Sequence, residues 1–170
     1  IESKFLGHAL RAPLLISAMT GGSGLAQEIN KRLATAAQRL GLAMGLGSQR
    51  ASIENPDLRE TYQVREYAPD ILLLANLGAV QLNHGYGVEE CHRAVQSVQA
   101  DGLVLHLNPL QEALQAGGNT DFQGLLEKIA HVCGTLERPV LIKEVGWGLS
   151  ARTARRLEKA GVDALDVSGA

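Results

Sequence analysis

Short apolar runs alternate with longer helix-like segments along the whole sequence. The runs cover residues 13–19, 42–46, 71–77, 103–108, 140–145 and 164–168, and their starts recur every 24 to 37 residues. This spacing fits one strand plus one crossover helix. Because the runs are continuously apolar instead of alternating, they indicate strands covered on both faces, as in a parallel sheet.

The segments between the runs carry helix signals. Residues 23–40 have an apolar stripe at helical spacing and end at Gly41, a C-terminal cap. Asn55-Pro56-Asp57 predicts a helix start, and that helix should run to about Tyr67. Further helices are predicted over residues 87–100, from a capping box at Thr120 to about residue 136, and from Ser150 to Gly161.

Five strand–helix units followed by a sixth strand predict an α/β fold with right-handed crossovers. A doubly wound dinucleotide-binding sheet would show GxGxxG after the first strand, and Thr20-Gly21-Gly22-Ser23-Gly24 does not match it. We therefore expect a (β/α)8 TIM barrel, of which the chain supplies about six strands and five helices. Residues 1–170 should form a single domain, the N-terminal and central part of a barrel truncated at both ends.

Composition narrows the function classes. The chain has 170 residues, 45% apolar and 20% charged, enough for a buried core. A net charge of −2 without a basic run argues against nucleic-acid binding. No apolar run approaches the roughly 20 residues of a membrane span. Cys91 and Cys133 lack metal-ligand spacing, so we expect reduced thiols in a cytoplasmic protein.

Polar residues stand at the carboxyl end of every predicted strand, where barrel enzymes place their active sites. The residues are Ser17 to Thr20, Gly47 to Arg50, Asn76, His106 and Asn108, Lys143 and Glu144, and Asp166 and Ser168. The fourth strand ends at Pro109 and is followed at once by Gln111 and Glu112. A carboxylate such as Glu112 suits Mg²⁺, which takes one or two protein carboxylates and completes its shell with water and phosphate.

Structural explanations stay open for single residues of this set. Asn76 can bond turn backbone, and His106 can be a satisfied core histidine. Lys143 can form a structural ion pair with Asp166 or Glu144, because a buried lysine needs a partner. Glu112 can be a first-turn acid of a short helix, and Arg50 a solvated loop charge.

Several motifs together resemble the type 2 isopentenyl-diphosphate isomerases over nearly the whole chain. They are Ser17-Ala18-Met19-Thr20-Gly21-Gly22, Gly47-Ser48-Gln49-Arg50, Ala75-Asn76-Leu77-Gly78, His106-Leu107-Asn108-Pro109-Leu110-Gln111-Glu112, Lys143-Glu144-Val145-Gly146 and Asp166-Val167-Ser168-Gly169-Ala170. The resemblance implies an FMN-binding (β/α)8 barrel that interconverts isopentenyl and dimethylallyl diphosphate. It also implies reduced FMN, NADPH as reductant, Mg²⁺, and a homo-oligomer, a tetramer or octamer.

The resemblance also implies a role for each matching position. FMN would be bound by Ala18, Met19, Thr20, Ser48, Asn76, Lys143 and Ser168. The substrate would be bound by Arg50, His106, Asn108 and Gln111, with Gln111 and His106 as catalytic residues, and Glu112 would hold Mg²⁺. The family's N-terminal Arg-Lys pair and its late glycine-rich phosphate loops do not occur in this chain.

Two rival functions are kept. One is another FMN-dependent barrel oxidoreductase acting on small hydroxy acids, which has no need of the Mg²⁺ that Glu112 would hold. The other is a non-catalytic barrel fragment or interaction module, against which the intact polar set at the strand ends argues.

Overall fold

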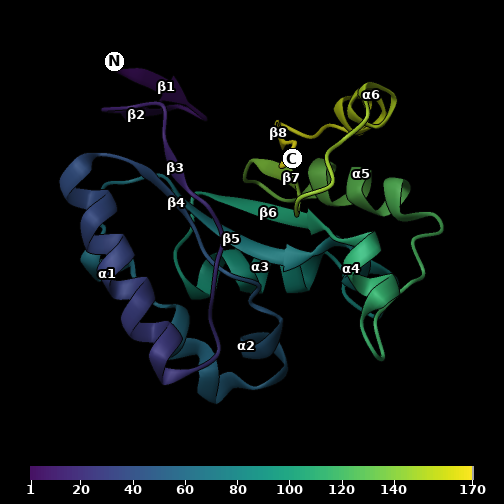
Figure 1. Ribbon diagram of the computed structural model, residues 1–170, viewed down its shortest axis with the longest axis horizontal. Coiled ribbons are helices and arrows are strands. Elements are labelled where there is room, and N and C mark those ends of the chain that lie inside the picture. Colours follow the sequence, from purple (N-terminus) through teal and green to yellow (C-terminus); the bar gives the residue numbers. More distant parts are fainter. Residues whose placement is uncertain (170) are drawn as a thin grey trace. The chain divides into compact units, whose positions relative to one another are not determined.

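The computed structural model describes residues 1–169 and contains a parallel sheet whose strand order follows the chain (Figure 1). The strands are β3 (Leu15–Ile16), β4 (Ala43–Gly45), β5 (Leu73–Gly78), β6 (Gly102–Leu107), β7 (Val140–Glu144) and β8 (Ala164–Asp166). The sheet order is β3-β4-β5-β6-β7-β8. A parallel sheet in chain order, joined by helical crossovers, is the arrangement of a (β/α)8 barrel and confirms the predicted fold class.

Helices join successive strands. The α-helices are α1 (Gly24–Leu40), α2 (Arg50–Glu54), α3 (Val88–Ser97), α4 (Pro109–Leu114), α5 (Leu125–Thr135) and α6 (Ala151–Lys159). The 3₁₀ helices are η1 (Pro56–Tyr62), η2 (Arg65–Tyr67) and η3 (Ala79–Asn83). Across residues 1–169, none of these helices combines the length and the apolar character that crossing a membrane requires.

A hairpin precedes the sheet. Its strands are β1 (Ser3–Phe5) and β2 (His8–Leu10), which pair antiparallel. Leu6 and Gly7 form the two-residue turn with φ of 46° and 86°. Positive φ at both central positions is the geometry of hairpin turns that match strand twist. The turn lacks the Asn or Asp that is common in two-residue hairpin turns. The sequence pattern therefore did not predict this hairpin.

The chain divides into two compact units. Unit 1 comprises residues 1–76 and 93–102, and unit 2 comprises residues 77–92 and those from Leu103 onward. Strands β3 and β4 and most of β5 belong to unit 1, whereas β7, β8 and nearly all of β6 belong to unit 2. The expectation of a single domain stays a prediction.

In unit 1, α1 begins and ends where the sequence predicts. Ser23 Oγ accepts a hydrogen bond from the Ala26 N–H at 3.2 Å, and Gly41 caps the other end with φ 62°. The helix packs on β4 and buries Ala26, Ala34 and Ala37. Small side chains on this face let the helix approach the sheet closely.

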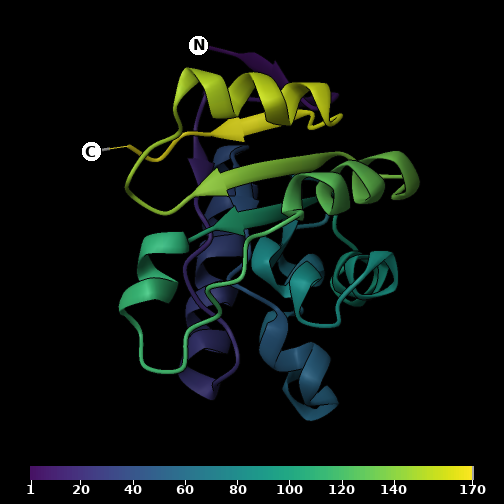
Figure 2. The same cartoon turned by 90° about the vertical axis from the view of Figure 1, so that its right-hand side faces the viewer.

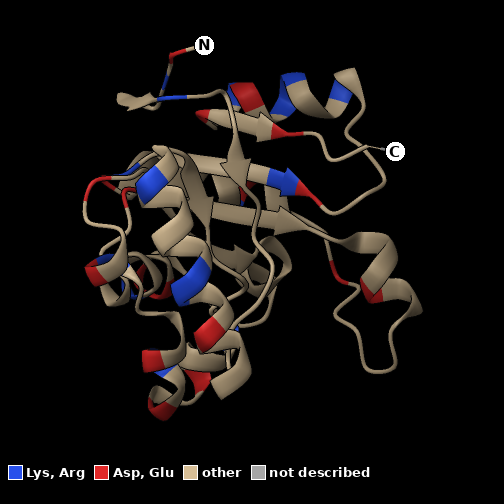
Figure 3. Ribbon diagram, turned by 60° about the vertical axis from the view of Figure 1, so that its left-hand side comes forward, with Lys and Arg blue, Asp and Glu red and all other residues tan. Residues whose placement is uncertain are grey.

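In unit 2, β6, β7 and β8 pair in parallel, and α5 and α6 pack against each other (Figure 2). The buried face of α5 consists of Leu125, Ile129 and Val132. Ser150 caps α6 by accepting the Thr153 N–H at 3.1 Å, as predicted. Charged residues of the chain lie mainly on helices and loops (Figure 3), so the strands can supply a dry core.

Two predicted helices differ from the observed ones. The segment after Asn55 is a pair of 3₁₀ helices instead of one α-helix, although Asn55 Oδ1 does accept the Asp57 N–H as expected. The expected capping box at Thr120 is wrong, because α5 begins after Gly124, which has φ 66°. The Asp121 carboxylate instead accepts a hydrogen bond from the Gln123 N–H, which is typical of a turn.

Cys91 and Cys133 are free thiols in the structure, as predicted. Burial raises the pKa of Cys91 to about 12 and that of Cys133 to about 11. Both groups are therefore protonated at neutral pH and act as small apolar side chains.

Candidate active site

In unit 2, three neighbouring strands place their predicted site residues in a row. His106 of β6 lies opposite Lys143 of β7, and Lys143 lies opposite Asp166 of β8. Partners in register on adjacent strands place their side chains on the same face of the sheet. The row runs across the carboxyl ends of β6, β7 and β8, where a barrel carries its chemistry.

Lys143 lies in the middle of this row, and its ammonium group has several partners. Its Nζ donates to Ser168 Oγ at 2.6 Å and to the Glu144 carbonyl at 2.9 Å. It also forms an ion pair with Asp166 Oδ2 at 3.3 Å. The ion pair with Asp166 was one of the alternatives left open by the sequence, and the structure shows that it forms. It offsets the cost of burying the ammonium.

Ser168 is tied into the same group. Its hydroxyl donates to Asp166 Oδ1 at 2.7 Å while accepting from Lys143. Its backbone has φ of 38°, a left-handed conformation that costs energy in a residue other than glycine. This strained turn brings the hydroxyl back onto Lys143.

Glu112 is held from two sides at the start of α4. Its Oε1 accepts a hydrogen bond from Asn108 Nδ2 at 2.8 Å, and its Oε2 accepts the Asn119 N–H at 2.6 Å. A Cβ on Gly118 would overlap the Glu112 carbonyl oxygen, so the returning loop lies directly on this helix. The carboxylate is thus fixed in position, with further lone pairs left on each oxygen.

The amide of Asn108 is only partly used. The residue is 4% exposed, and its Oδ1 has no hydrogen-bond partner among the described residues. A buried acceptor without a donor costs about 1–3 kcal/mol, so such a group usually faces a water or ligand. Asn108 is therefore the residue of this segment whose hydrogen bonding is most clearly incomplete.

His106 lies against Gly78, the last residue of β5. A Cβ at Gly78 would come within 3.2 Å of His106 Nε2, so the glycine makes room for the imidazole. Burial lowers the pKa of His106, Glu112 raises it and Lys143 lowers it, and the net shift is downward from 6.5. The imidazole is therefore neutral near pH 7 and can both donate and accept a proton.

Gln111 is exposed on α4, one residue before Glu112. The catalytic roles expected of Gln111 and His106 stay predictions. Trp147 is also exposed, at 68%, on the loop that follows β7.

In unit 1, the loop after β3 lies on the loop after β4. A Cβ on Gly47 would overlap the Thr20 backbone, and one on Gly45 would come within 3.5 Å of the Ala18 nitrogen. Met19 is 75% exposed and Ser48 is exposed beside this contact. The structure therefore brings together Ala18, Thr20 and the β4 loop, with Met19 and Ser48 accessible.

Tyr62 and Gln49 support these loops, and sequence reasoning gave neither a role. Tyr62 is 2% exposed and donates its hydroxyl to the Ser48 carbonyl at 2.7 Å. Gln49 is fully buried; its Oε1 accepts the Asn76 N–H at 3.0 Å and its Nε2 donates to the Ala94 carbonyl at 2.9 Å. For Gln49, the sequence signal was a glutamine at the end of a glycine-rich loop.

Asn76 and Arg50 have different surroundings. Asn76 is 2% exposed at the end of β5, and its carbonyl accepts the Gln49 N–H at 2.8 Å. Arg50 opens α2 and pairs with Glu54 at 2.7 Å, with both side chains about half exposed. An exposed pair of this kind contributes little stability.

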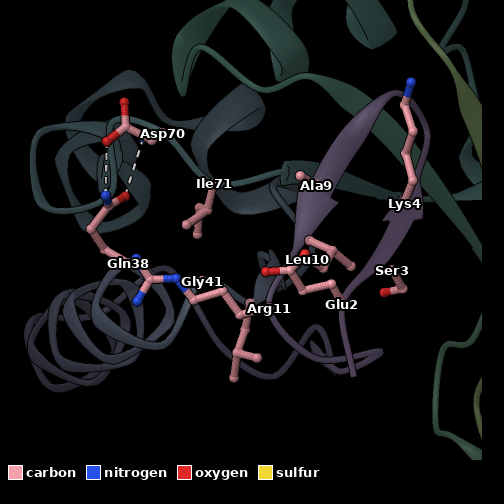
Figure 4. Close-up of a pocket in the computed structure, with 11 residues that line it drawn as sticks. Glu2, Ser3, Lys4, Ala9, Leu10, Arg11, Gln38, Gly41, Asp70 and Ile71 are labelled. Carbon is pink, nitrogen blue, oxygen red and sulfur yellow. Dashed lines mark hydrogen bonds between the residues drawn. The ribbon is translucent and has the colours of Figure 1, made fainter.

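One cavity of unit 1 lies at the opposite ends of its strands. It measures about 630 Å³ and is lined by the hairpin, the end of α1 and the residues just before β5 (Figure 4). Gln38 closes one side by a 2.9 Å hydrogen bond to Asp70. The amino-terminal face of a barrel serves stability, and none of the predicted site residues lines this cavity.

Within the described residues, no group of three or more His, Cys, Asp or Glu side chains could hold a metal ion by itself. A Mg²⁺ ion can be held by a single protein carboxylate, with water and phosphate oxygens completing its shell. Glu112 fits that role, because its carboxylate is fixed and its oxygens keep free lone pairs.

The strand order, with polar residues at the carboxyl ends of the strands, defines part of a (β/α)8-barrel protein. Solved structures confirm the fold. A mutant of an active chimera of (S)-mandelate dehydrogenase matches with a TM-score of 0.65 and 18% identity, over 96% of this chain and 53% of that one. A mandelate oxidase mutant with an FMN adduct matches with a TM-score of 0.64 and 15% identity, over 96% and 50%.

Sequence relatives are more specific. The chain is 59% identical over 170 residues to an isopentenyl-diphosphate delta-isomerase of Synechococcus sp., covering 100% of this chain and 49% of the relative. It is 59% identical over 164 residues to that of Synechocystis sp. (96% and 47%), and 55% identical over 170 residues to that of Deinococcus radiodurans (100% and 50%). No family model matches the chain.

Over its whole length the chain is thus similar in sequence to named isopentenyl-diphosphate delta-isomerases. It spans about half the length of the curated relatives that it matches.

Proposed function

We propose that the protein containing this chain interconverts isopentenyl and dimethylallyl diphosphate as a type 2, FMN-dependent isomerase. The observation that carries the proposal is the fixed carboxylate of Glu112, held by Asn108 and Asn119 in a chain 59% identical to named isomerases. An isomerase acting on a diphosphate uses such a carboxylate to hold Mg²⁺, whereas a hydroxy-acid oxidase has no use for it.

The residues of unit 1 fit a flavin. The loop after β3 offers backbone beside the exposed Met19 side chain, and Gly47 allows that loop to lie on the next one. Ala18, Met19, Thr20, Ser48 and Asn76 would hold FMN in this unit. Bound reduced FMN would supply the group that gives and takes a proton at an apolar alkene.

Lys143 and Ser168 are the other two residues that we propose to bind FMN. The ammonium is fixed by Ser168, Asp166 and the Glu144 carbonyl, so it needs little reorganisation to stabilise an electron-rich ring. A preorganised positive charge of this kind stabilises developing negative charge better than a mobile one in water.

The substrate would bind through its diphosphate. Glu112 would hold Mg²⁺ against the diphosphate, and Arg50 and Asn108 would bind or orient the substrate. His106, neutral because burial lowers its pKa, would move a proton, and Gln111 would lie beside the reacting carbons. The reaction adds a proton at one carbon and removes one from another, so it involves no net oxidation or reduction.

The rival hydroxy-acid oxidoreductase draws on the structural matches, which include mandelate oxidases. Their identity of 14–18% supports the shared fold alone. Identities of 51–59% to isomerases favour the isomerase.

The test is an anaerobic assay of the encoded protein that contains this chain, with isopentenyl diphosphate, Mg²⁺ and FMN reduced by NADPH. We expect dimethylallyl diphosphate to form, and no product to form with oxidised FMN. Oxidation of mandelate or lactate by the same preparation, without isomerisation, would instead support the oxidoreductase. We also propose that the protein forms a tetramer or octamer, which light scattering can check.

A further inference from the structure

Glu144, the last residue of β7, holds the loop that follows it. Its Oε2 accepts the backbone N–H groups of Val145, Gly146, Trp147 and Gly148, at 2.7, 2.7, 2.6 and 3.2 Å. The residue is 4% exposed. A carboxylate surrounded by successive backbone N–H groups is strongly stabilised, because each donor points at the same charge.

The loop needs its glycines to take this shape. Gly146 and Gly148 have φ of 145° and 83°, which other residues rarely adopt. The converging N–H groups of such a turn carry partial positive charge and would repel one another without an anion at their centre. The sequence therefore supplies both the turn and the anion that stabilises it.

The loop next contacts the segment that follows β8. Trp147 and Gly169 form an isolated bridge, and a Cβ on Gly148 would lie 3.5 Å from the Gly169 Cα. Gly169 follows Ser168, whose hydroxyl accepts the 2.6 Å hydrogen bond from Lys143. A continuous set of contacts thus leads from the Glu144 carboxylate through the loop to the Lys143 ammonium.

We propose that Glu144 is a positioning residue for Lys143, acting through the loop 145–148 and the Ser168 turn. It holds Lys143 twice, through its own carbonyl at 2.9 Å and through the loop that its carboxylate orders. The inference deepens the proposed function, on which it rests for the catalytic meaning of Lys143. The placement of Lys143 itself can be measured without flavin or substrate.

The test measures the reactivity of the Lys143 amine in the encoded protein without FMN, by competitive acetylation and mass spectrometry. In Glu144→Gln the loop loses its anion, and Lys143 should react about fivefold to tenfold faster, because a less ordered contact set shields the amine less. Lys128, which donates to the Leu82 carbonyl at 2.8 Å, is the internal reference and should not change.

Three further variants keep the test decisive. Gly148→Ala strains the same loop while keeping the Glu144 carboxylate, and should raise Lys143 reactivity even if Glu144→Gln does not fold. Gly85→Ala introduces the same kind of strain at φ 88° with open space around it, and should leave Lys143 unchanged. Glu137→Gln makes the same charge change at an exposed position before β7 and should also have no effect.

The outcomes separate this inference from the proposed function. Unchanged Lys143 reactivity in folded Glu144→Gln, or in Gly148→Ala if the first variant does not fold, overturns the inference even if the wild type is an active isomerase. Increased reactivity supports it even if isomerisation is absent. In an active enzyme, Glu144→Gln should lower kcat about tenfold with KM for isopentenyl diphosphate nearly unchanged, since it misplaces a group and removes no substrate contact.

Discussion

Asn108 donates a 2.8 Å hydrogen bond to Glu112 across the first turn of α4, while its own Oδ1 stays buried without a partner among the described residues. The pair lies directly after β6, so the strand fixes Asn108 and Asn108 fixes the carboxylate. A ligand or water at the free oxygen would complete the hydrogen bonding.

Glu112→Gln should weaken Mg²⁺ binding. The amide can still accept the Asn119 N–H, so the fold should survive, but the negative charge that attracts the cation is lost. We expect the Mg²⁺ concentration for half-maximal isomerisation to rise at least tenfold, equivalent to about 1.4 kcal/mol. Glu127→Gln, an exposed acid on α5, is the control and should leave the Mg²⁺ titration unchanged.

Gly118→Ala should disturb the same carboxylate from the other side. Its Cβ would overlap the Glu112 carbonyl, so the loop that brings Asn119 to Glu112 must move. Overpacking of this kind costs about 1–3 kcal/mol. Thermal unfolding should show a lower Tm for this variant.

Gly134→Ala is the matched glycine variant for that comparison. Gly134 lies in α5 with open space around its Cα, so an added methyl meets nothing and removes helix-disfavouring flexibility. Its free energy of unfolding should rise by about 0.5–1 kcal/mol. A Gly118→Ala protein as stable as Gly134→Ala would contradict the close contact at Glu112.

Lys143→Ala should lower both FMN affinity and isomerase activity, because the same ammonium group would bind FMN and stabilise the reduced ring. It also leaves Asp166 without its cation at 3.3 Å. Equilibrium binding of FMN by fluorescence quenching and the isomerase assay provide the two measurements. Lys128→Ala serves as control, and isomerisation surviving intact in Lys143→Ala would remove the proposed role.

The pH dependence of stability should carry the signature of His106. Burial lowers its pKa below the value of 6.5 that it has when unfolded. Between these two values the unfolded chain binds more protons than the folded one, so the free energy of unfolding falls as the pH decreases. Urea unfolding from about pH 7 downward should show this loss, and His106→Gln should reduce it. An NMR titration midpoint of His106 at or above 6.5 would be inconsistent with the structure.

Much of the fold could be predicted because local signals and burial agree. Ser23 and Gly41 delimit α1 as expected, and Ser150 caps α6. The segment after Asn55 carried helix-start signals yet forms 3₁₀ turns, and the structure gives no single local cause for the difference. The start of α5 was misplaced because a left-handed Gly124, and not Thr120, precedes it.

The sequence predicted individual residues of the candidate site, but not the hydrogen bonds that connect them. His106 and Lys143 follow from polar residues ending apolar strands, since parallel strands bring such ends to one edge. The roles of Glu144 and Gln49 do not follow, because they depend on a loop conformation and on a hydrogen bond to Ala94, 45 residues away. Long-range contacts of buried polar groups leave no periodic pattern in a sequence.

Proton exchange with solvent tests the central claim most directly. Isopentenyl diphosphate should be incubated in D₂O with the encoded protein, Mg²⁺ and reduced FMN, and the products followed by ²H NMR. Proton addition and elimination predict deuterium in the dimethylallyl diphosphate that forms, and none when FMN is oxidised. Unlabelled, unconverted isopentenyl diphosphate after incubation with protein that demonstrably binds FMN would contradict the account.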